Sequence, residues 1–218
     1  MAGESPRRRY ESLHRTAQAQ QTGAQIARAA RELFVTRGWA ATTVREVARA
    51  AGVSTPTVYA VYGNKSGLTR ALADAADLSG DLPRMIEGLE TAAGPAGQLA
   101  AMVAYDRRLF ERSGDVIVAL REAGRSEPAL AQVYRDGRRR ADEVRAEVFA
   151  GWPPGTLRSG VTSAAAVDIY AALCTIDVFT ELTGERGWTP DAVQRWWSGI
   201  LSRDLLAAPG DSAGPDRE

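Results

Sequence analysis

The 218-residue sequence predicts an all-α protein with a small N-terminal helical domain and a larger helical body behind it. Apolar residues recur at helical spacing along most of the chain, and helix-capping residues precede several of these segments. No stretch alternates apolar and polar residues as a half-buried strand does, and no Asn-Gly pair marks a tight hairpin. The length is enough for one or two domains whose cores need neither disulfides nor metals.

The first predicted helix follows a polar N-terminal segment. Residues 1–20 are rich in Arg, Gln, Ser and Ala without a sustained apolar period, so we expect a disordered basic arm. From residue 26 onward the apolar residues occupy one face of a helix, and Gly38 is a suitable C-terminal stop. That face consists of Ile26, Ala29, Ala30, Leu33 and Phe34.

Two short helices with a tight turn between them are predicted next. Thr43 is a good N-cap for the first helix, and Ala51-Gly52-Val53 forms the turn. Ser54 caps the second helix, where Pro56 falls in the first turn and its missing N–H costs little. Such a pair of helices is the geometry that lays a helix into the major groove of DNA. We therefore expect a helix-turn-helix DNA-binding domain over residues 21–66.

The remaining chain predicts a helical regulatory body over residues 67–207, followed by a disordered tail over residues 208–218. Helix starts at Pro, Asp or Thr and stops at Gly divide this body into segments. The predicted helices are Lys65 to about Ala75, Pro95–Arg112, Asp115–Ala123, Pro128–Phe149, Thr162 to about Thr183, and a last one that begins at Thr189. The last helix carries an apolar stripe that is wide enough to require a partner surface, formed by Val193, Trp196, Trp197, Ile200, Leu201 and Leu205.

Charge is unevenly distributed along a chain whose net charge is zero. Residues 1–70 contain 11 Lys and Arg against 4 Asp and Glu, so the remainder is acidic. A basic N-terminal third is expected if that part faces a polyanion such as double-stranded DNA. Chance clustering on solvated helix faces is the alternative. The arginines Arg7, Arg8 and Arg9 could track the minor groove or serve only as a solubilising tail.

Composition argues against an enzyme, a metal-binding protein, a membrane protein and an exported protein. The only histidine, His14, lies in the expected arm and the only cysteine, Cys174, in a predicted helix, so we expect no catalytic residues, no metal site and no cofactor. No apolar run reaches the roughly 18 residues of a membrane span, and no apolar segment follows the N-terminal arginines, so we expect a soluble cytoplasmic protein. Cys174 is expected to be a buried thiol, with a redox sensor as the alternative.

The segment from Ala29 to Leu68 resembles the TetR family of transcriptional regulators. The shared features are a helix ending in Phe34, the Gly38-Trp39 turn, Thr43, the Ala51-Gly52-Val53-Ser54 turn, Thr57-Val58-Tyr59 and Lys65. One departure is Val61-Tyr62, where the family often has His-Phe or Tyr-Phe, and Tyr62 is expected to replace the Phe in packing. The resemblance implies a transcriptional regulator, commonly a repressor, that binds a palindromic operator as a dimer.

Chemistry and resemblance together assign roles in the expected DNA-binding domain. Val58 is expected in the core, whereas Thr55, Pro56, Thr57 and Ala60 are expected to point outward and to reach base edges. Ser54, the N-cap of the same helix, is counted with the DNA-binding residues. Tyr59 is expected to contact a phosphate. Helix N-termini favour phosphate oxygens, which gives the same role to Thr42, Thr43 and Lys65, although Thr43 can also act as a plain cap. Arg45 is expected to be exposed, where it can bond a base, a phosphate or only water.

For the helical body, the resemblance implies a small-molecule effector site and a homodimer. Aromatic residues that could line the effector site are Tyr105, Phe110, Tyr134, Phe149, Trp152, Tyr170 and Phe179, and ordinary core packing is the alternative for each. The dimer interface is expected on the last two helices, at Leu173, Val193, Trp196, Trp197, Ile200 and Leu201, and intramolecular packing is the alternative for the two tryptophans. An architectural DNA-binding protein without an effector is the other function that these features allow.

Overall fold

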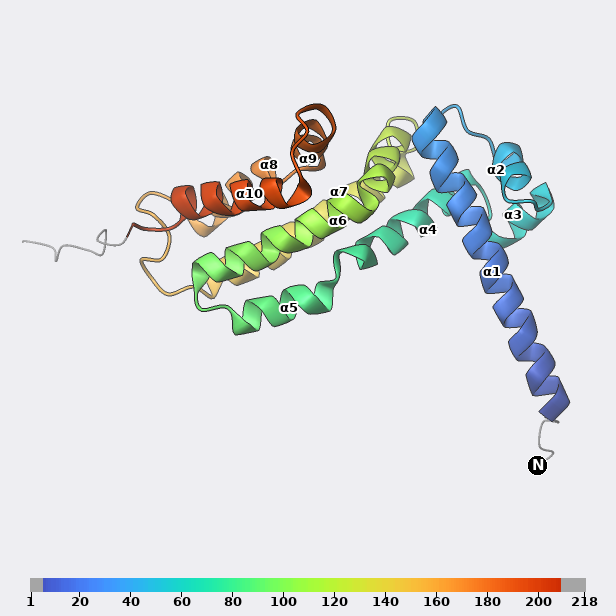
Figure 1. Ribbon diagram of the computed structural model, residues 1–218, viewed down its shortest axis with the longest axis horizontal. Helices are drawn as coiled ribbons and strands as arrows, with labels where there is room; N and C mark the ends of the chain where they lie inside the picture. The colour runs from blue at the N-terminus through green and yellow to red at the C-terminus, as the bar shows by residue number, and fades with distance from the viewer. Residues whose placement is uncertain (1–5, 209–218) are drawn as a thin grey trace, which may run out of the picture. The chain divides into compact units, whose positions relative to one another are not determined.

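The computed structural model describes the backbone of residues 6–208 and, within that range, all side chains except those of residues 6–15, 77 and 78 (Figure 1). The described residues form helices and their connections, with one isolated antiparallel bridge between Leu157 and Leu206 and no strand. The predicted all-α fold is therefore confirmed. Two compact units divide the chain: unit 1 comprises Met1–Asp74 and Ala119–Ala131, and unit 2 comprises Ala75–Val118 and Gln132–Glu218.

Unit 1 contains the three N-terminal helices and most of the fourth, which are α1 (Pro6–Arg37), α2 (Val44–Ala50), α3 (Thr55–Tyr62) and α4 (Lys65–Asp77). Its core takes a buried side chain from each of the first three helices: Phe34 from α1, Val47 from α2 and Val58 from α3. Gly38 follows α1 with a φ of 80°, a left-handed conformation that glycine adopts without steric cost. The predicted three-helix arrangement is thus present, and the short helices α2 and α3 are held by a shared core.

The prediction of a disordered arm over residues 1–20 is wrong for residues 6–20, which form the first turns of α1. Residues 1–5 lie outside the described residues. The segment is rich in Ala, Arg and Gln, which have high intrinsic helix propensity. The residues from Thr16 to Gln21 are exposed, so the missing apolar period reflects a helix that leaves the core rather than an absence of helix.

Unit 2 contains the rest of the chain. Its elements are η1 (Leu78–Gly80), α5 (Leu82–Thr91), most of α6 (Pro95–Ala123) and of α7 (Pro128–Ala150), α8 (Ser163–Leu173), α9 (Ile176–Thr180), the π-helical turn η2 (Glu181–Glu185) and α10 (Pro190–Leu205). Its core surrounds Tyr170 and Trp197, which are fully buried. Pro83 lies in the first turn of α5, where its missing N–H is tolerated.

Of two predicted helix breaks and joins in unit 2, one agrees with the structure and one differs. The predicted break between Arg112 and Asp115 agrees with a kink in α6 at Ser113, whose φ of −142° and ψ of 15° are not helical. Conversely, the single helix predicted from residue 162 to about 183 is divided after α8, because Cys174 leaves the helical conformation and the Thr175 side chain caps α9. Thr175 accepts a hydrogen bond from the Val178 amide (3.2 Å), which is an N-cap signal inside an apolar stretch.

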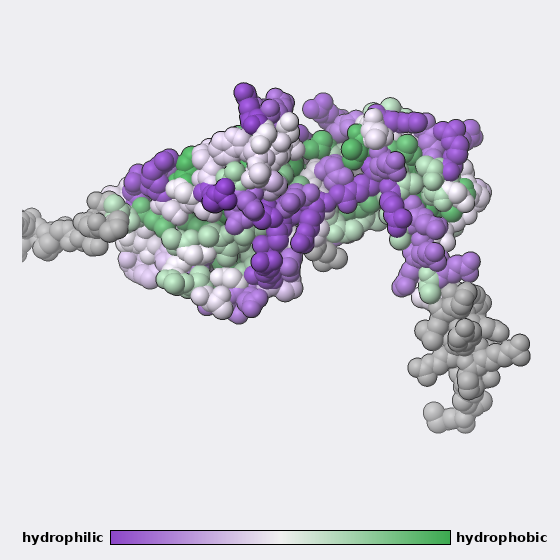
Figure 2. All heavy atoms as spheres, in the orientation of Figure 1, coloured by the Kyte–Doolittle hydropathy of each residue, from purple (hydrophilic) through white to green (hydrophobic). Residues whose placement is uncertain are grey.

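Residues 163–185 form the one described segment that is long and apolar enough to cross a membrane by length and composition. In the structure this segment is interrupted between α8 and α9, and its buried residues Tyr170, Ile176 and Phe179 belong to the core of unit 2. The face of the molecule in Figure 2 shows hydrophilic and hydrophobic residues intermixed rather than a continuous apolar belt. Core packing therefore accounts for part of the apolar composition of the segment.

Candidate nucleic-acid interface and ligand pocket

Helix α3 presents one face to the core of unit 1 and the other to solvent. Its inner face is anchored by Val58, which is completely buried. The Ser54 hydroxyl oxygen accepts a hydrogen bond from the Thr57 amide (3.2 Å) and fixes the start of the helix. The exposed positions are Pro56, Tyr59, Ala60 and Val61, and Tyr59 is 50% exposed. A capped short helix with a small, exposed opening turn has the shape that enters a major groove.

Two hydroxyl groups of the predicted DNA-binding residues are engaged with each other. The side-chain oxygens of Ser54 and Thr57 lie 2.8 Å apart, within hydrogen-bond distance. A hydroxyl group has one donor and two acceptor sites, so each retains capacity for a further bond. Thr55 is half-buried at the first position of α3. The structure thus brings the predicted residues of the opening turn together on one end of α3.

Thr42 is a correction to the predicted phosphate contacts. Its side chain is 1% exposed, and its hydroxyl donates to the carbonyl oxygens of Gly38 (2.9 Å) and Leu33 (3.2 Å). A buried hydroxyl that already bonds the end of α1 cannot reach a phosphate. Its role is to close the turn between α1 and α2, which the helix-terminus pattern in the sequence could not distinguish from an exposed position.

Thr43 caps α2 in a capping box with Glu46. The Glu46 amide donates to the Thr43 hydroxyl oxygen (3.3 Å), and the Thr43 amide donates to the Glu46 carboxylate (2.8 Å). Hydrogen bonds from the Thr43 amide and hydroxyl lower the pKa of Glu46, and Arg37 contributes in the same direction from 2.9 Å. Thr43 remains exposed, so capping leaves it accessible. Arg45 and Arg49 are also exposed on α2.

Lys65 lies at the start of α4 over the indole ring of Trp39, with Nζ 3.7 Å from the ring centroid. The indole N–H donates to the Thr69 hydroxyl (2.8 Å), which fixes the ring. Burial lowers the pKa of Lys65, whereas the charges of Glu122 and Glu127 act in the opposite direction. Lys65 was predicted as a site residue, but the cation–π contact was not, because Trp39 lies 26 positions earlier in the chain.

Tyr62 fills the position where the family often has Phe. Its ring is half-buried, and its hydroxyl donates to the carbonyl oxygen of Gly23 on α1 (2.9 Å). Burial raises the pKa of Tyr62. The prediction that Tyr62 packs in place of Phe agrees with this position, and the structure adds a hydrogen bond that phenylalanine could not make.

The end of α6 completes unit 1. The Glu122 carboxylate accepts hydrogen bonds from the backbone amides of Trp39 (3.2 Å) and Ala40 (3.3 Å), in the turn that follows α1. The Ser66 hydroxyl donates to Glu127 at 3.4 Å. Residues about 80 positions away therefore hold the turn that leads into the two short helices. No local sequence signal indicated this connection.

The effector-site prediction can be compared with a pocket of about 340 Å³ within unit 2, lined by residues of α5, α6, α7 and α8. Of the predicted aromatic residues, Tyr105 and Tyr170 line this pocket. The others do not: Phe110 packs against Phe179 with ring centroids 5.9 Å apart, Phe149 packs against Trp152 at 4.8 Å, and Tyr134 is half-buried elsewhere on α7. For these aromatic residues, core packing is the better interpretation.

The polar wall of the pocket is formed by residues that the sequence analysis missed. Asp106 and Arg145 form a buried ion pair at 3.0 Å, and the Tyr170 hydroxyl donates to the same Asp106 oxygen (2.9 Å). Burial raises the pKa of Asp106, and the Arg145 charge opposes the shift. A charged residue on the otherwise apolar inner face of α6 was the available signal. Cys174, beneath this group, is buried as predicted, and burial raises the pKa of its thiol.

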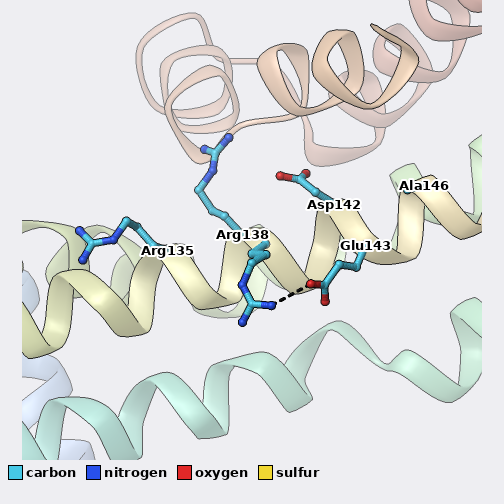
Figure 3. Close-up of a pocket in the computed structure, with 6 residues that line it drawn as sticks. Arg135, Arg138, Asp142, Glu143 and Ala146 are labelled. Carbon is cyan, nitrogen blue, oxygen red and sulfur yellow. Dashed lines mark hydrogen bonds and ion pairs between the residues drawn. The ribbon is translucent and has the colours of Figure 1, made fainter. Parts of the chain in front are cut away.

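A second hollow, of about 440 Å³, lies on the surface of α7. Figure 3 shows Arg135, Arg138, Asp142 and Glu143 close together there, with the ion pair between Glu143 and Arg139 (2.8 Å) marked. These charges are mostly exposed and partly paired with one another, which is typical of a solvated helix face. The pocket lined by Asp106 is the better candidate for a ligand.

Part of the predicted dimer interface requires correction. Val193, Trp197 and Leu201 have no exposed surface because they pack into the core of their own chain, so a second copy cannot contact them. For Trp197, intramolecular packing is therefore the correct alternative. The other predicted residues, Leu173, Trp196 and Ile200, are half-buried and retain surface.

Comparison with known proteins gives three consistent results. Residues 26–79 match the family model for bacterial regulatory proteins of the tetR family. The regulator AlkX of Mycobacterium tuberculosis is 47% identical over 45 residues, which are 21% of each chain, and TtgR of Pseudomonas putida is 43% identical over 58 residues, 27% of this chain and 28% of TtgR. The matched segments thus span between a fifth and a third of these curated relatives.

Solved structures extend the similarity to most of the chain. A tetR-family protein from Rhodococcus RHA1 is 24% identical with a TM-score of 0.70, covering 86% of this chain and 98% of its own. A transcriptional regulator from Saccharomonospora viridis, solved in complex with choline, is 19% identical with a TM-score of 0.70 over 87% and 100%. NalD of Pseudomonas aeruginosa, the secondary repressor of the MexAB-OprM multidrug efflux pump, is 23% identical with a TM-score of 0.65 over 87% and 98%. Because all three sequence identities are below 25%, the structural similarity shows a shared fold and nothing further.

Proposed function

Because residues 26–79 match the family model for bacterial regulatory proteins of the tetR family, we propose that the chain is a member of that family and a ligand-responsive transcriptional repressor that binds a palindromic operator as a homodimer. The observation that carries this proposal is the geometry of α3, whose buried Val58 orients an exposed, capped opening turn outward. The family consists of regulators rather than enzymes. We place the protein in the cytoplasm, where its DNA is.

The proposed DNA contacts divide into reading and positioning residues. Thr55, Pro56 and Thr57 read base edges from the opening turn of α3, where small side chains allow close approach. Tyr59 contacts a phosphate with its exposed ring edge and hydroxyl. The DNA backbone is positioned in the same way by the exposed residues Thr43, Arg45 and Ser54 and by the half-buried Lys65.

The proposed division of labour assigns residues 21–66 to DNA binding and residues 67–207 to effector binding and dimerisation. Helix α6 contributes to both compact units, since its first part carries the pocket residues Met102 and Asp106 and its last turn carries Glu122. A ligand in the pocket therefore contacts the same helix that holds the turn before α2. The dimer interface uses the half-buried residues Leu173, Trp196 and Ile200.

In vitro selection tests this function directly. The full-length protein is incubated with a pool of randomised duplexes, and bound DNA is sequenced after several rounds. Two-fold symmetry requires two copies of α3 in successive major grooves, so the enriched sequence should be palindromic with half-sites about one helical turn apart. Enrichment without any consensus would instead indicate an architectural DNA-binding protein, and absence of enrichment would contradict DNA binding.

A further inference from the structure

The pocket of unit 2 joins an apolar cavity to one buried polar group. Its apolar lining includes Leu82, Met85, Met102, Leu109 and Val144. A volume of about 340 Å³ is near the lower end of what small-molecule sites enclose. The polar group consists of Asp106, Arg145 and Tyr170, all of which line the same pocket and are buried. The charge state of this group decides which ligand the pocket accepts.

The positive charge of Arg145 is already paired with two carboxylates of its own chain. One terminal nitrogen donates to Asp106 (3.0 Å) and the other to Asp142 (2.7 Å), while the guanidinium carbon lies 4.4 Å from the centre of the Tyr170 ring. A ligand carboxylate would be placed beside the Asp106 carboxylate and would be repelled. Arg140 also lines the pocket, but it is exposed to solvent, where ion pairs contribute little.

A cationic ligand is disfavoured by the same arrangement. The Asp106 carboxylate is already neutralised by the Arg145 guanidinium at 3.0 Å, so a ligand cation near Asp106 would lie beside a like charge in a buried site. Desolvating that cation would then have no compensating partner. The aromatic face of Tyr170, which could otherwise bind a cation, is occupied by Arg145.

The second carboxylate oxygen of Asp106 remains as a hydrogen-bond acceptor. Both protein donors reach Oδ2 of Asp106, and no donor among the described residues reaches Oδ1. A neutral hydroxyl or N–H can bond to this oxygen without adding a charge to the site. We propose that the pocket binds a neutral, mainly apolar molecule that carries a hydroxyl or similar donor, and that this donor bonds to Asp106. The inference rests on the proposed function, because it names the class of the effector.

Calorimetry with a series of probes of similar chain length tests the class. 1-Octanol, octanoate and octyltrimethylammonium carry unbranched alkyl chains of seven or eight carbons and differ in charge, while heptyl methyl ether is an isomer of octanol that cannot donate a hydrogen bond. Octanol should bind most tightly, and its advantage over the ether should be on the order of tenfold, since a hydrogen bond to a charged group is lost. Binding of octanoate or octyltrimethylammonium at least as tight as that of octanol overturns the inference.

Two variants on α7 locate the site. Ala141 lines the pocket, so Ala141→Phe should fill it and abolish the heat of octanol binding. Ala146 is exposed on the same helix and does not line this pocket, so Ala146→Phe should bind octanol as the unaltered protein does. Octanol binding that survives Ala141→Phe in a folded protein, or an absence of octanol binding, overturns the inference.

Release of DNA is measured separately, by fluorescence anisotropy of the selected duplex. If octanol binds the pocket but never releases the duplex, the ligand class is supported and the proposed regulation fails. If octanoate binds and releases the duplex while octanol does not bind, the regulation is supported and the ligand class fails. The two proposals can therefore be refuted independently of one another.

Discussion

Removal of the Glu122 carboxylate should loosen the turn that precedes α2. The Glu122 carboxylate accepts hydrogen bonds from the backbone amides of Trp39 (3.2 Å) and Ala40 (3.3 Å), and Glu122→Ala removes both hydrogen bonds. Hydrogen bonds to charged groups contribute about 1.5 to 3 kcal/mol each, but these two are long and partly exposed. We therefore expect a total loss of about 1 to 2 kcal/mol.

Hydrogen exchange followed by NMR measures this loss at the two amides themselves. A loss of about 1 to 2 kcal/mol in local opening corresponds to roughly 5- to 30-fold faster exchange at Trp39 and Ala40. Glu122→Gln keeps one acceptor oxygen and should give an intermediate effect. Glu32 is exposed in unit 1, and its side chain makes no hydrogen bond among the described residues, so Glu32→Gln is the matched control and should leave exchange unchanged. Equal exchange rates in Glu122→Ala and the unaltered protein would refute this account of the turn.

Three further predictions concern DNA specificity, pH and dimerisation. Thr55→Val should weaken binding to the selected duplex by about 1 to 3 kcal/mol but hardly affect binding to random DNA. Lys65→Met should weaken binding to the selected and the random duplex equally and reduce the slope of log affinity against log salt concentration by about one. Binding titrations at two salt concentrations measure both effects, and the reverse pattern would interchange the roles of the two residues. Because the pKa of Tyr62 is raised, its contribution to stability is complete below the ordinary tyrosine pKa and is lost as the pH rises through the higher folded-state pKa. Tyr62→Phe should therefore lower the free energy of unfolding by about 0.5 to 1.5 kcal/mol near pH 7, and in urea titrations the variant should lose less stability than the unaltered protein above about pH 10. Identical pH profiles of stability for the two proteins would count against this role of Tyr62. Trp196→Glu should give a folded monomer by light scattering, whereas Trp197→Ala should lower the free energy of unfolding by about 3 to 5 kcal/mol, and a Trp196→Glu protein that stays dimeric would place the interface elsewhere.

Local signals made the short helices of unit 1 predictable. Thr43 and Ser54 cap their helices in the structure with the bonds that their sequence positions suggest. Burial of a polar residue next to such a cap was not predictable, and Thr42 was misassigned because its accessibility depends on packing between α1 and α2. Capping is a property of four neighbouring residues, whereas exposure is a property of the whole unit.

Apolar periodicity predicted α10 correctly but not what covers it. The stripe that contains Val193, Trp197 and Leu201 indicates a buried face, and the same pattern serves a core or an interface. Likewise, nothing in the sequence connects Asp106 with Arg145, which lie 39 positions apart on two different helices, α6 and α7. Contacts between distant helices depend on how the helices pack, which periodicity does not specify.

The return of Ala119–Ala131 to unit 1 limits how the DNA-binding part can be separated from the rest. A fragment that ends at Asp74 would contain the helices α1, α2 and α3 and yet lack Glu122, which would leave the amides of Trp39 and Ala40 without their acceptor. A chimera that joins these three helices to another helical body would need an acidic residue at the position that corresponds to Glu122. The DNA-binding unit is contiguous in space but not in sequence, so it is not a portable module.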